Sequence, residues 1–233
     1  MGLVKVPASI SALFTKKSSQ KTQIQEQFAD VFIRIGKLPG EVAIHVKQNS
    51  IPSVHHVRRI PFALNERAKS QLDRLECLDI IEKVTTPTKW VNLIVAVEKS
   101  DGSLRLCLDP RELNKAVKRL HNPMATFEDI AANTHGQNKF SKLDTRSGYW
   151  MLALNKESSL LTTFGTPFGR YKYKRVPYGI KCAQDEFQRK MEETLGNLKC
   201  ASIIVDDILV SGKDEEHDEN LKVVLQKARD DGV

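Results

Sequence analysis

Two adjacent carboxylates, Asp206 and Asp207, lie inside the otherwise apolar and β-branched segment Ala201–Val210. This pattern predicts two buried strands that meet at a tight turn, with both acids in or beside the turn. Burial of an unpaired carboxylate is costly, so buried acids are kept where a cation balances them, and two together indicate a divalent metal. The alternative is that the two acids simply form a hairpin turn, because Asp tolerates turn conformations.

Asp144 is a third carboxylate in a similar place. The segment that begins at Lys139 alternates apolar and polar residues and ends at Asp144, and the turn-forming residues Ser147 and Gly148 follow it. If this strand lies beside segment 201–210, the three carboxylates meet at one end of a sheet. Their oxygens suit hard cations such as Mg²⁺, and sites of this kind commonly hold two ions about 4 Å apart. The expected chemistry is phosphoryl or nucleotidyl transfer.

The elements that must position these acids can be outlined from hydrophobic periodicity. We expect strands over 139–145 and 150–155, a helix over about 183–196, a hairpin over 201–211 and a last helix over about 215–229. This order predicts an α+β fold in which helices pack on one face of an antiparallel sheet.

The first half of the chain is expected to contain a second hairpin and several helices. Residues 90–97 and 104–108 predict strands joined by a turn at 100–103. A short helix is expected around 22–32. Capping residues indicate further helix starts at Asn65, Asp109 and Thr126. As a helix cap, Asp109 needs no catalytic role.

Residues 165–184 contain five cations and no acid, in a chain whose net charge is +7. These cations, called the basic strip below, are Arg170, Lys172, Lys174, Arg175 and Lys181. A basic strip beside an acidic site suits a phosphate backbone, so nucleic acid is the expected partner. A solvated protein face is the alternative. Interleaved aromatic residues either stack on bases or fill the core, and we favour a core position for Tyr171 or Tyr173.

Cysteine usage and hydropathy bear on the class of protein. The four cysteines are far apart and lack the spacing of metal ligands, which predicts a reduced intracellular protein with cysteines that serve as inert packing residues. No stretch approaches the length of an apolar membrane span, and the N-terminus lacks a secretory signal, so we expect no membrane partner.

Five ordered blocks of the 233-residue sequence resemble the reverse transcriptases of gypsy-like long-terminal-repeat retrotransposons. The blocks are Lys37–Gly40, Trp90–Lys115, Phe140–Asp144, Leu161–Tyr171 and Ile204–Val210. Any one block alone is a weak signal, whereas their order together is highly specific.

The resemblance implies a right-hand polymerase fold within an element's Pol polyprotein. Residues 1–36 are expected to form a partly flexible N-terminal segment, 37–138 mainly the fingers, and 139–233 mainly a ferredoxin-like palm with an antiparallel sheet. The thumb and ribonuclease H domains of such polymerases are expected to be absent. A cytoplasmic location follows from the resemblance, or a virus-like particle if the element is active.

The resemblance also implies an RNA-directed DNA polymerase, which adds dNTPs to the 3′-hydroxyl of a primer on an RNA or DNA template. Asp144, Asp206 and Asp207 are then catalytic, and together with Thr145 they hold two Mg²⁺ ions, for which Mn²⁺ is an alternative. Further nucleotide-binding residues are expected at Lys99, Arg105, Ser147, Gly148, Tyr149 and Tyr178. Gln188 joins the basic strip as an expected contact of the nucleic acid.

Three of these roles have simpler alternatives. Lys99 and Arg105 flank the turn of the first hairpin, where the family grips the triphosphate of the nucleotide, but they also read as exposed surface cations. Tyr149 lies where the family carries the aromatic residue that excludes a 2′-hydroxyl, and it also reads as a core aromatic at the start of a strand.

Two other function classes remain open from the sequence. One is an inactive or domesticated retrotransposon fragment that acts at most as a nucleic-acid-binding module. The other is a different palm-domain polymerase or a cyclase, because fold and metals do not by themselves define the substrate. The finger blocks disfavour the second class.

Overall fold

The computed structural model describes residues 18–98, 100, 102–120, 122 and 124–233, and the prediction for residues 1–17 therefore lies outside the described residues. The helices are α2 (Ser18–Gln27), α3 (Ala29–Ile33), η2 (Phe62–Leu64), α4 (Asn65–Cys77), α5 (Arg111–Ala116), α6 (Phe127–Asn133), η3 (Gly148–Met151), α7 (Lys156–Leu161), α8 (Ala183–Leu195) and α9 (Asp214–Asp231). The strands are β1 (Glu41–Val42), β2 (Ile81–Lys83), β3 (Leu93–Glu98), β4 (Leu104–Asp109), β5 (Lys139–Asp144), β6 (Ala153–Leu154), β7 (Phe164–Thr166), β8 (Gly169–Tyr173), β9 (Ala201–Ile204) and β10 (Asp207–Gly212).

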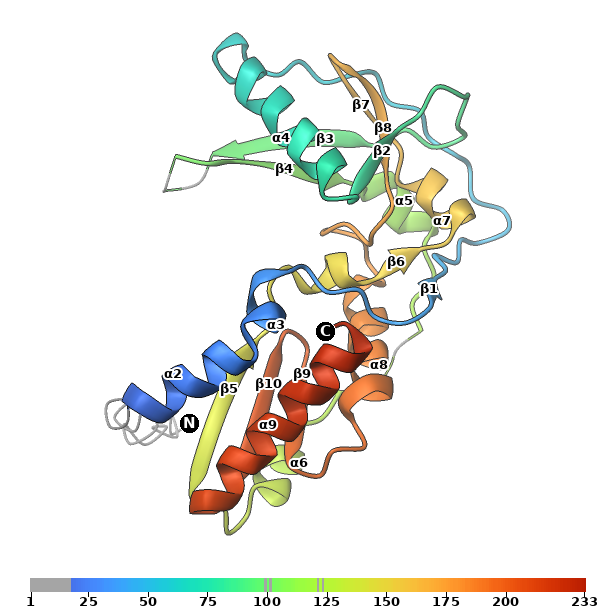
Figure 1. The fold of residues 1–233 in the computed structure, drawn as a ribbon. Helices are drawn as coiled ribbons and strands as arrows, with labels where there is room; N and C mark the ends of the chain where they lie inside the picture. Colours follow the sequence, from blue (N-terminus) through green and yellow to red (C-terminus); the bar gives the residue numbers. More distant parts are fainter. Residues whose placement is uncertain (1–17, 99, 101, 121, 123) are drawn as a thin grey trace, which may run out of the picture.

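The elements form two lobes, one above the other in Figure 1. The lower lobe, called the carboxylate lobe, is built on an antiparallel sheet with the strand order β5-β10-β9. Helices α8 and α9 contact each other, α8 contacts β9, and α9 contacts β10 and β5, so helices cover one face of the sheet. Apolar Ile208 and Val210 of β10 are buried. This is the α+β layer that the sequence predicts.

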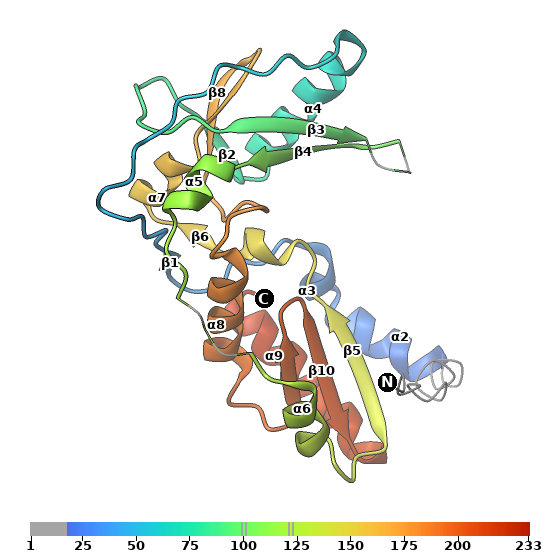
Figure 2. The same ribbon diagram turned by 180° about the vertical axis from the view of Figure 1, so that it is seen from behind.

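The upper lobe, called the hairpin lobe, contains two small sheets and helix α4. One sheet has the antiparallel order β2-β8-β7, and the other is the β3–β4 hairpin. On β4, Leu104, Leu106 and Leu108 are buried while Arg105 is exposed, which is the alternation expected of a sheet with one wet face. Helix α4 packs against β4 and β2. Figure 2 shows the hairpin projecting away from the rest of this lobe.

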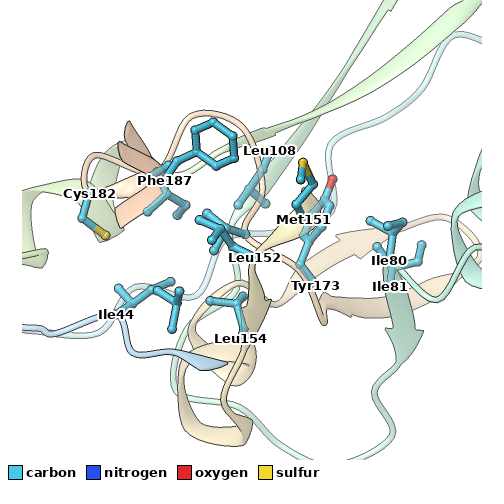
Figure 3. Close-up of a cluster of buried hydrophobic side chains, with 14 of the residues drawn as sticks. Ile44, Ile80, Ile81, Leu108, Met151, Leu152, Leu154, Tyr173, Cys182 and Phe187 are labelled. Carbon is cyan, nitrogen blue, oxygen red and sulfur yellow. The ribbon is translucent and has the colours of Figure 1, made fainter. Parts of the chain in front are cut away.

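The lobes share one core rather than two. Strand β1 pairs in parallel with β6 between them, and one continuous set of buried apolar side chains extends from Ile80 and Ile81 in the hairpin lobe to Phe187 in the carboxylate lobe. Figure 3 shows Leu108, Met151, Leu152 and Tyr173 among the side chains of this cluster. The position of one lobe relative to the other is therefore supported by close packing, which resists changes of volume.

Most of the predicted elements are confirmed. Strand β5, the β9–β10 hairpin, the β3–β4 hairpin and helices α8 and α9 lie where the periodicity predicts them. The capping box at Thr126 is present, since the Thr126 hydroxyl accepts the Asp129 N–H and the Asp129 carboxylate accepts the Thr126 N–H. Tyr171 and Tyr173 are both buried in the core.

Other local predictions are wrong. The expected strand 150–155 is a 3₁₀ turn, η3, followed by the short β6, because the consecutive side chains of Met151 and Leu152 are both buried and do not alternate. Asn65 is not a cap but already helical, after the turn η2. Asp109 ends β4, and its carboxylate accepts three hydrogen bonds from the Arg111 guanidinium instead of capping α5.

The N-terminal helix and the cysteines differ in detail from expectation. The helix expected around 22–32 is two helices, α2 and α3, that meet at Phe28. Phe28 packs with Ile24 and Leu225, so this segment covers part of α9. All four cysteines are free thiols, and burial raises the pKa of the Cys182 thiol to about 11. A thiol in that state is unreactive at neutral pH.

Candidate active site

The antiparallel register of the carboxylate lobe brings the acids to one end of its sheet. Asp207, the first residue of β10, is the direct partner of Asp144, the last residue of β5. Asp206 occupies the turn between β9 and β10. Directly opposed residues of antiparallel strands point to the same face of the sheet, so Asp144 and Asp207 share a face. In Figure 1 this end of the sheet points toward the hairpin lobe.

Thr145 joins the end of β5 to the turn. Its backbone N–H donates a hydrogen bond of 2.9 Å to the Asp206 carbonyl oxygen, and its hydroxyl donates one of 3.1 Å to the same oxygen. Two donors on one carbonyl restrict the peptide that carries Asp206. Thr145 therefore positions an acid through the backbone of the turn.

The acids place concentrated negative charge at this site. Burial raises the pKa of the Asp206 carboxyl, and the nearby carboxylates of Asp144 and Asp207 raise it further. Within the described part of the chain, one ion pair involves these acids, and it joins Lys142 Nζ to Asp207 Oδ2 at 2.8 Å. The hydrogen bond with Asp207 in turn raises the pKa of Lys142. Because one cation faces three carboxylates, the site is suited to receive further positive charge.

The donor set fits a divalent metal only in part. Within the described residues, no three His, Cys, Asp or Glu side chains are already gathered in the arrangement of a metal cage. The available donors are nevertheless carboxylate oxygens, which hard divalent cations prefer, and Asp206 lies near the negative charges of Asp144 and Asp207. Asp144 and Asp206 would hold such an ion, with Asp207 joining once it leaves Lys142.

The turn η3 packs directly against Asp206 and Thr145. Gly148 is buried, and a Cβ added there would lie 2.7 Å from Asp206 Oδ1, 2.8 Å from Phe187 Cζ and 2.9 Å from Thr145 Oγ1. Only glycine permits this close approach. Ser147, just before it, adopts the left-handed conformation with φ of 59°. The two residues thus form a sharp turn that places Tyr149 beside the acids.

An aromatic group lies on the hairpin-lobe side of the carboxylates. The Tyr149 ring lies 5.0 Å from the Tyr178 ring and 5.8 Å from the Phe187 ring, measured between centroids. The guanidinium of Arg105 stacks 4.5 Å from the centroid of Tyr178. Burial raises the pKa values of both tyrosines, and the Asp206 charge raises them further. The structure thus brings Arg105, Tyr149 and Tyr178 together near the acids, whereas Lys99 lies outside the described residues.

The comparison with protein families is decisive. The family described as reverse transcriptase (RNA-dependent DNA polymerase) matches residues 97–233, which is more than half of the chain and contains every predicted site residue. The chain belongs to the reverse transcriptase family. The predicted enzyme class, a nucleotidyltransferase of the RNA-directed DNA polymerase type by resemblance, is thereby supported.

Relatives of this reverse transcriptase chain occur in viruses and transposons. The enzymatic polyprotein of cauliflower mosaic virus (strain D/H) is 32% identical over 186 residues, which cover 76% of this chain and 27% of the polyprotein. The transposon Tf2-3 polyprotein of Schizosaccharomyces pombe is 35% identical over 139 residues, which cover 58% of this chain and 10% of the polyprotein. The chain thus spans less than a third of the length of these relatives.

A solved structure has the same fold. The foamy viral protease-reverse transcriptase, in complex with double-stranded DNA, gives a TM-score of 0.78 at 21% identity and covers 94% of this chain and 40% of that chain. This likeness confirms the predicted polymerase fold. In the described part of the reverse transcriptase chain, no helix combines the length and apolarity that crossing a bilayer requires.

The basic strip of the reverse transcriptase chain is not gathered at the carboxylates. Four of its cations bind partners elsewhere: Arg170 donates to the Thr86 carbonyl, Lys172 pairs with Glu82, Lys174 pairs with Asp79, and Arg175 donates to the Trp150 carbonyl. Lys181 is exposed. The first three lie on or directly after β8 in the hairpin lobe, so contact with nucleic acid stays a prediction for them.

Gln188 occupies a different environment from the one expected of a nucleic-acid contact. It is fully buried in α8, and its amide binds the backbone of the β9–β10 turn. A direct contact with nucleic acid is not available to it in this structure. The residues near Gln188 in the sequence do not predict these bonds, because the bonded backbone groups are 15 and 17 positions away.

Two further residues of the site were missed by the sequence analysis. Lys142 is one; its position two residues before Asp144 puts both on the same face of β5, which is a signal that period-2 reasoning can use. Asn114 is the other. Its side chain donates to the Gly179 carbonyl and accepts the Lys181 N–H, both at 2.8 Å, and so holds the turn that carries Tyr178.

Proposed function

We propose that this chain is the fingers and palm part of an RNA-directed DNA polymerase, which adds dNTPs to a primer 3′-hydroxyl by two-metal nucleotidyl transfer. One observation carries the proposal: β5 and β10 pair so that Asp144 opposes Asp207, with Asp206 in the adjoining turn. The chain that carries these three acids belongs to the reverse transcriptase family, and the family match includes all three. The proposed fingers are mainly 37–138 and the proposed palm mainly 139–233.

The proposed metal ligands are the three acids together with Thr145. When bound, Mg²⁺ or Mn²⁺ ions would lower the pKa of the primer hydroxyl and balance the charge that develops on pyrophosphate. The protein's part is to keep Asp206 close to Asp144, which the two hydrogen bonds from Thr145 to the Asp206 carbonyl support. Before a metal binds, Asp207 is paired with Lys142.

The proposed nucleotide pocket lies between the acids and the hairpin lobe. Arg105 is exposed on β4 and stacks on Tyr178, so its guanidinium is placed to meet a triphosphate. Tyr149 presents its ring beside Tyr178 and near Asp206, where a 2′-hydroxyl on the sugar would meet it. Ser147 and Gly148 supply the turn on which Tyr149 stands.

The proposed partners are a primer paired with an RNA or DNA template, and dNTPs. The similarity to a polymerase solved with double-stranded DNA supports a duplex as the ligand of this fold. The positive net charge of +7 favours a polyanion.

Primer extension with Mg²⁺ and dNTPs on an RNA template tests the proposal. Asp206→Asn keeps the shape of the side chain but removes its charge, so we expect extension to be abolished while duplex binding is retained. Asp73→Asn, on the exposed face of α4 where Asp73 pairs with Lys69, is the matched control and should extend as the unchanged protein does. Equal extension by the Asp206→Asn and Asp73→Asn proteins would exclude the metal role.

A nucleic-acid-binding module without catalysis is the second candidate. The observation that favours it is the Lys142–Asp207 ion pair, because a cation already occupies one of the acids. This candidate predicts that neither Mn²⁺ nor the Asp206→Asn change alters the affinity for a duplex. It also predicts that no variant extends a primer.

A further inference from the structure

The amide of Gln188 binds the end of β9 and the first residue of the turn that carries Asp206. Its Oε1 accepts the Val205 N–H at 2.8 Å, and its Nε2 donates to the Ile203 carbonyl at 3.2 Å. Nε2 also donates to Glu192 Oε1 at 2.7 Å, one helical turn further along α8. Gln188 is 0% exposed, and its bond to the Ile203 carbonyl is buried, whereas the bonds to Val205 and Glu192 are partly buried. The Glu192 carboxylate accepts only, which determines which end of the amide faces Val205.

Val205 has a backbone conformation that its side chain disfavours. Its φ is 52°, in the left-handed region where a β-branched residue is a genuine outlier. Such a conformation persists only where the surroundings over-determine it. Here the surroundings are the Gln188 acceptor on the Val205 N–H and the strand pairing of Ile204 with Asp207 across the turn.

The conformation of Val205 determines where Asp206 lies. The peptide that joins the two residues rotates with the Val205 backbone, and the next constraint along the chain is the pair of hydrogen bonds from Thr145 to the Asp206 carbonyl. If Val205 returned to the extended region, that carbonyl would turn away from Thr145. The Asp206 carboxylate would then leave its neighbour Asp144.

We propose that Gln188 is a positioning residue that holds Val205 in the left-handed conformation and thereby keeps Asp206 beside Asp144. This inference rests on the proposed function of the acids as metal ligands. It replaces the expected contact of Gln188 with nucleic acid by a role inside the protein. Gln188 touches neither the metal nor the nucleotide and acts through the backbone of the turn.

The proposal predicts a specific rescue. Glycine adopts the left-handed conformation without a steric penalty, so Val205→Gly should remove the need for Gln188. The set to compare is therefore Gln188→Ala, Val205→Gly and the double variant Gln188→Ala/Val205→Gly. Gln226→Ala, which removes a glutamine side chain hydrogen-bonded to Asp230 on α9, is the matched control for loss of an amide.

Mn²⁺ binding, measured by electron paramagnetic resonance, is the first readout, because it requires no primer. Gln188→Ala should weaken Mn²⁺ binding about tenfold or more, as changes to groups that orient metal ligands commonly do. The double variant should recover most of this loss. Hydrogen exchange of the Val205 amide should accelerate in Gln188→Ala, and circular dichroism should report a folded protein in every variant.

Two outcomes overturn the proposal. One is an unchanged Mn²⁺ affinity in folded Gln188→Ala protein. The other is an equal loss in the single and double variants, which would assign Gln188 to general packing of α8. Failure of the proposed function would give a different result, in which no variant extends a primer. If Gln188→Ala still weakens Mn²⁺ binding in that case, and Val205→Gly still restores it, the positioning role is supported.

Discussion

At the scale of single residues, the site depends on close approach rather than on long side chains. Gly148 lies against Asp206, Thr145 and Phe187 without room for a methyl group. The Thr145 hydroxyl restrains Asp206 by donating a hydrogen bond to the Asp206 carbonyl oxygen. A small change in any of these residues therefore moves a carboxylate, and sub-ångström positions matter for a reaction in which the groups must be aligned.

Gly148→Ala is expected to impair catalysis more than folding. The added Cβ would stand 2.7 Å from Asp206 Oδ1, and the flexible carboxylate, rather than the backbone, would give way. We expect primer extension to fall at least about tenfold, since misplacement of a catalytic group by about 1 Å is costly. Extension rates and thermal melting of the same preparation check this. An unchanged extension rate would contradict the contact.

Tyr149→Ala is expected to raise the incorporation of ribonucleotides relative to deoxyribonucleotides. Removing the ring opens the place where a 2′-hydroxyl would otherwise collide. Single-nucleotide extension with dCTP or CTP opposite the same template base gives the ratio. Tyr178→Phe is the control, because it keeps the neighbouring ring and removes only a hydroxyl group. Sugar selectivity that does not change in Tyr149→Ala would remove the gate role from this residue.

Among the candidate site residues, sequence reasoning was informative where chemistry and local pattern coincide. The acids at the ends of β5 and β10 were predicted because carboxylates interrupt apolar alternation there. The structure also brings Arg105, Tyr149 and Tyr178 together. The burial of Gln188 and its bonds to a turn 15 to 17 residues away could not be predicted, because no periodicity reports such a contact.

At the scale of elements, regular alternation of apolar residues and capping residues predicted strands and helix starts well. Elements whose burial is irregular were not predicted. The β3–β4 and β9–β10 hairpins and the box at Thr126 follow from local rules. The segment after Gly148 failed because Met151 and Leu152 are both buried between the lobes. The run Trp150–Leu154 is apolar throughout and has no period-2 pattern, so its sequence does not distinguish a strand from a buried turn.

Helix α4 supports the β3–β4 hairpin, so its core face should matter for stability. Leu72→Ala empties a side chain that is 0% exposed, and we expect the free energy of unfolding to fall by about 3 kcal/mol. Leu78→Ala, at a leucine that is 41% exposed just after the helix, is the matched control, with an expected loss below about 1 kcal/mol. Urea denaturation measures both. Similar losses in the two variants would show that α4 does not anchor the lobe.

At the scale of the whole molecule, the N-terminal segment is tied to the end of the last helix. The Lys37 N–H donates to the Gly232 carbonyl at 2.5 Å, and Arg229 binds Asp30 and stacks on Phe28. The segment that leads into the hairpin lobe is thereby fastened to α9 of the carboxylate lobe. Changes at this contact should affect the stability of both lobes together.

Gly232→Ala is expected to destabilise the protein more than Gly136→Ala does. Both glycines have a left-handed φ, 74° and 76°, so alanine costs similar backbone strain at each, about 1 kcal/mol. A Cβ at Gly232 would also lie 2.6 Å from the Lys37 carbonyl oxygen, whereas one at Gly136 meets nothing within 4 Å. Thermal unfolding of the two variants isolates the steric part. Equal melting temperatures would show that the contact with Lys37 yields without cost.

The pairing of β2 with β8 has a consequence for the order in which the protein can be made. Ile81 and Tyr173 are partners, yet the whole of β5 lies between them in the sequence. During synthesis, β2 must therefore wait until β8 has left the ribosome, and by then the first strand of the other lobe has already emerged. Contacts of such long sequence separation slow folding and leave strand edges exposed meanwhile. Neither lobe is a contiguous stretch of chain, and a nascent polypeptide cannot complete one before starting the other.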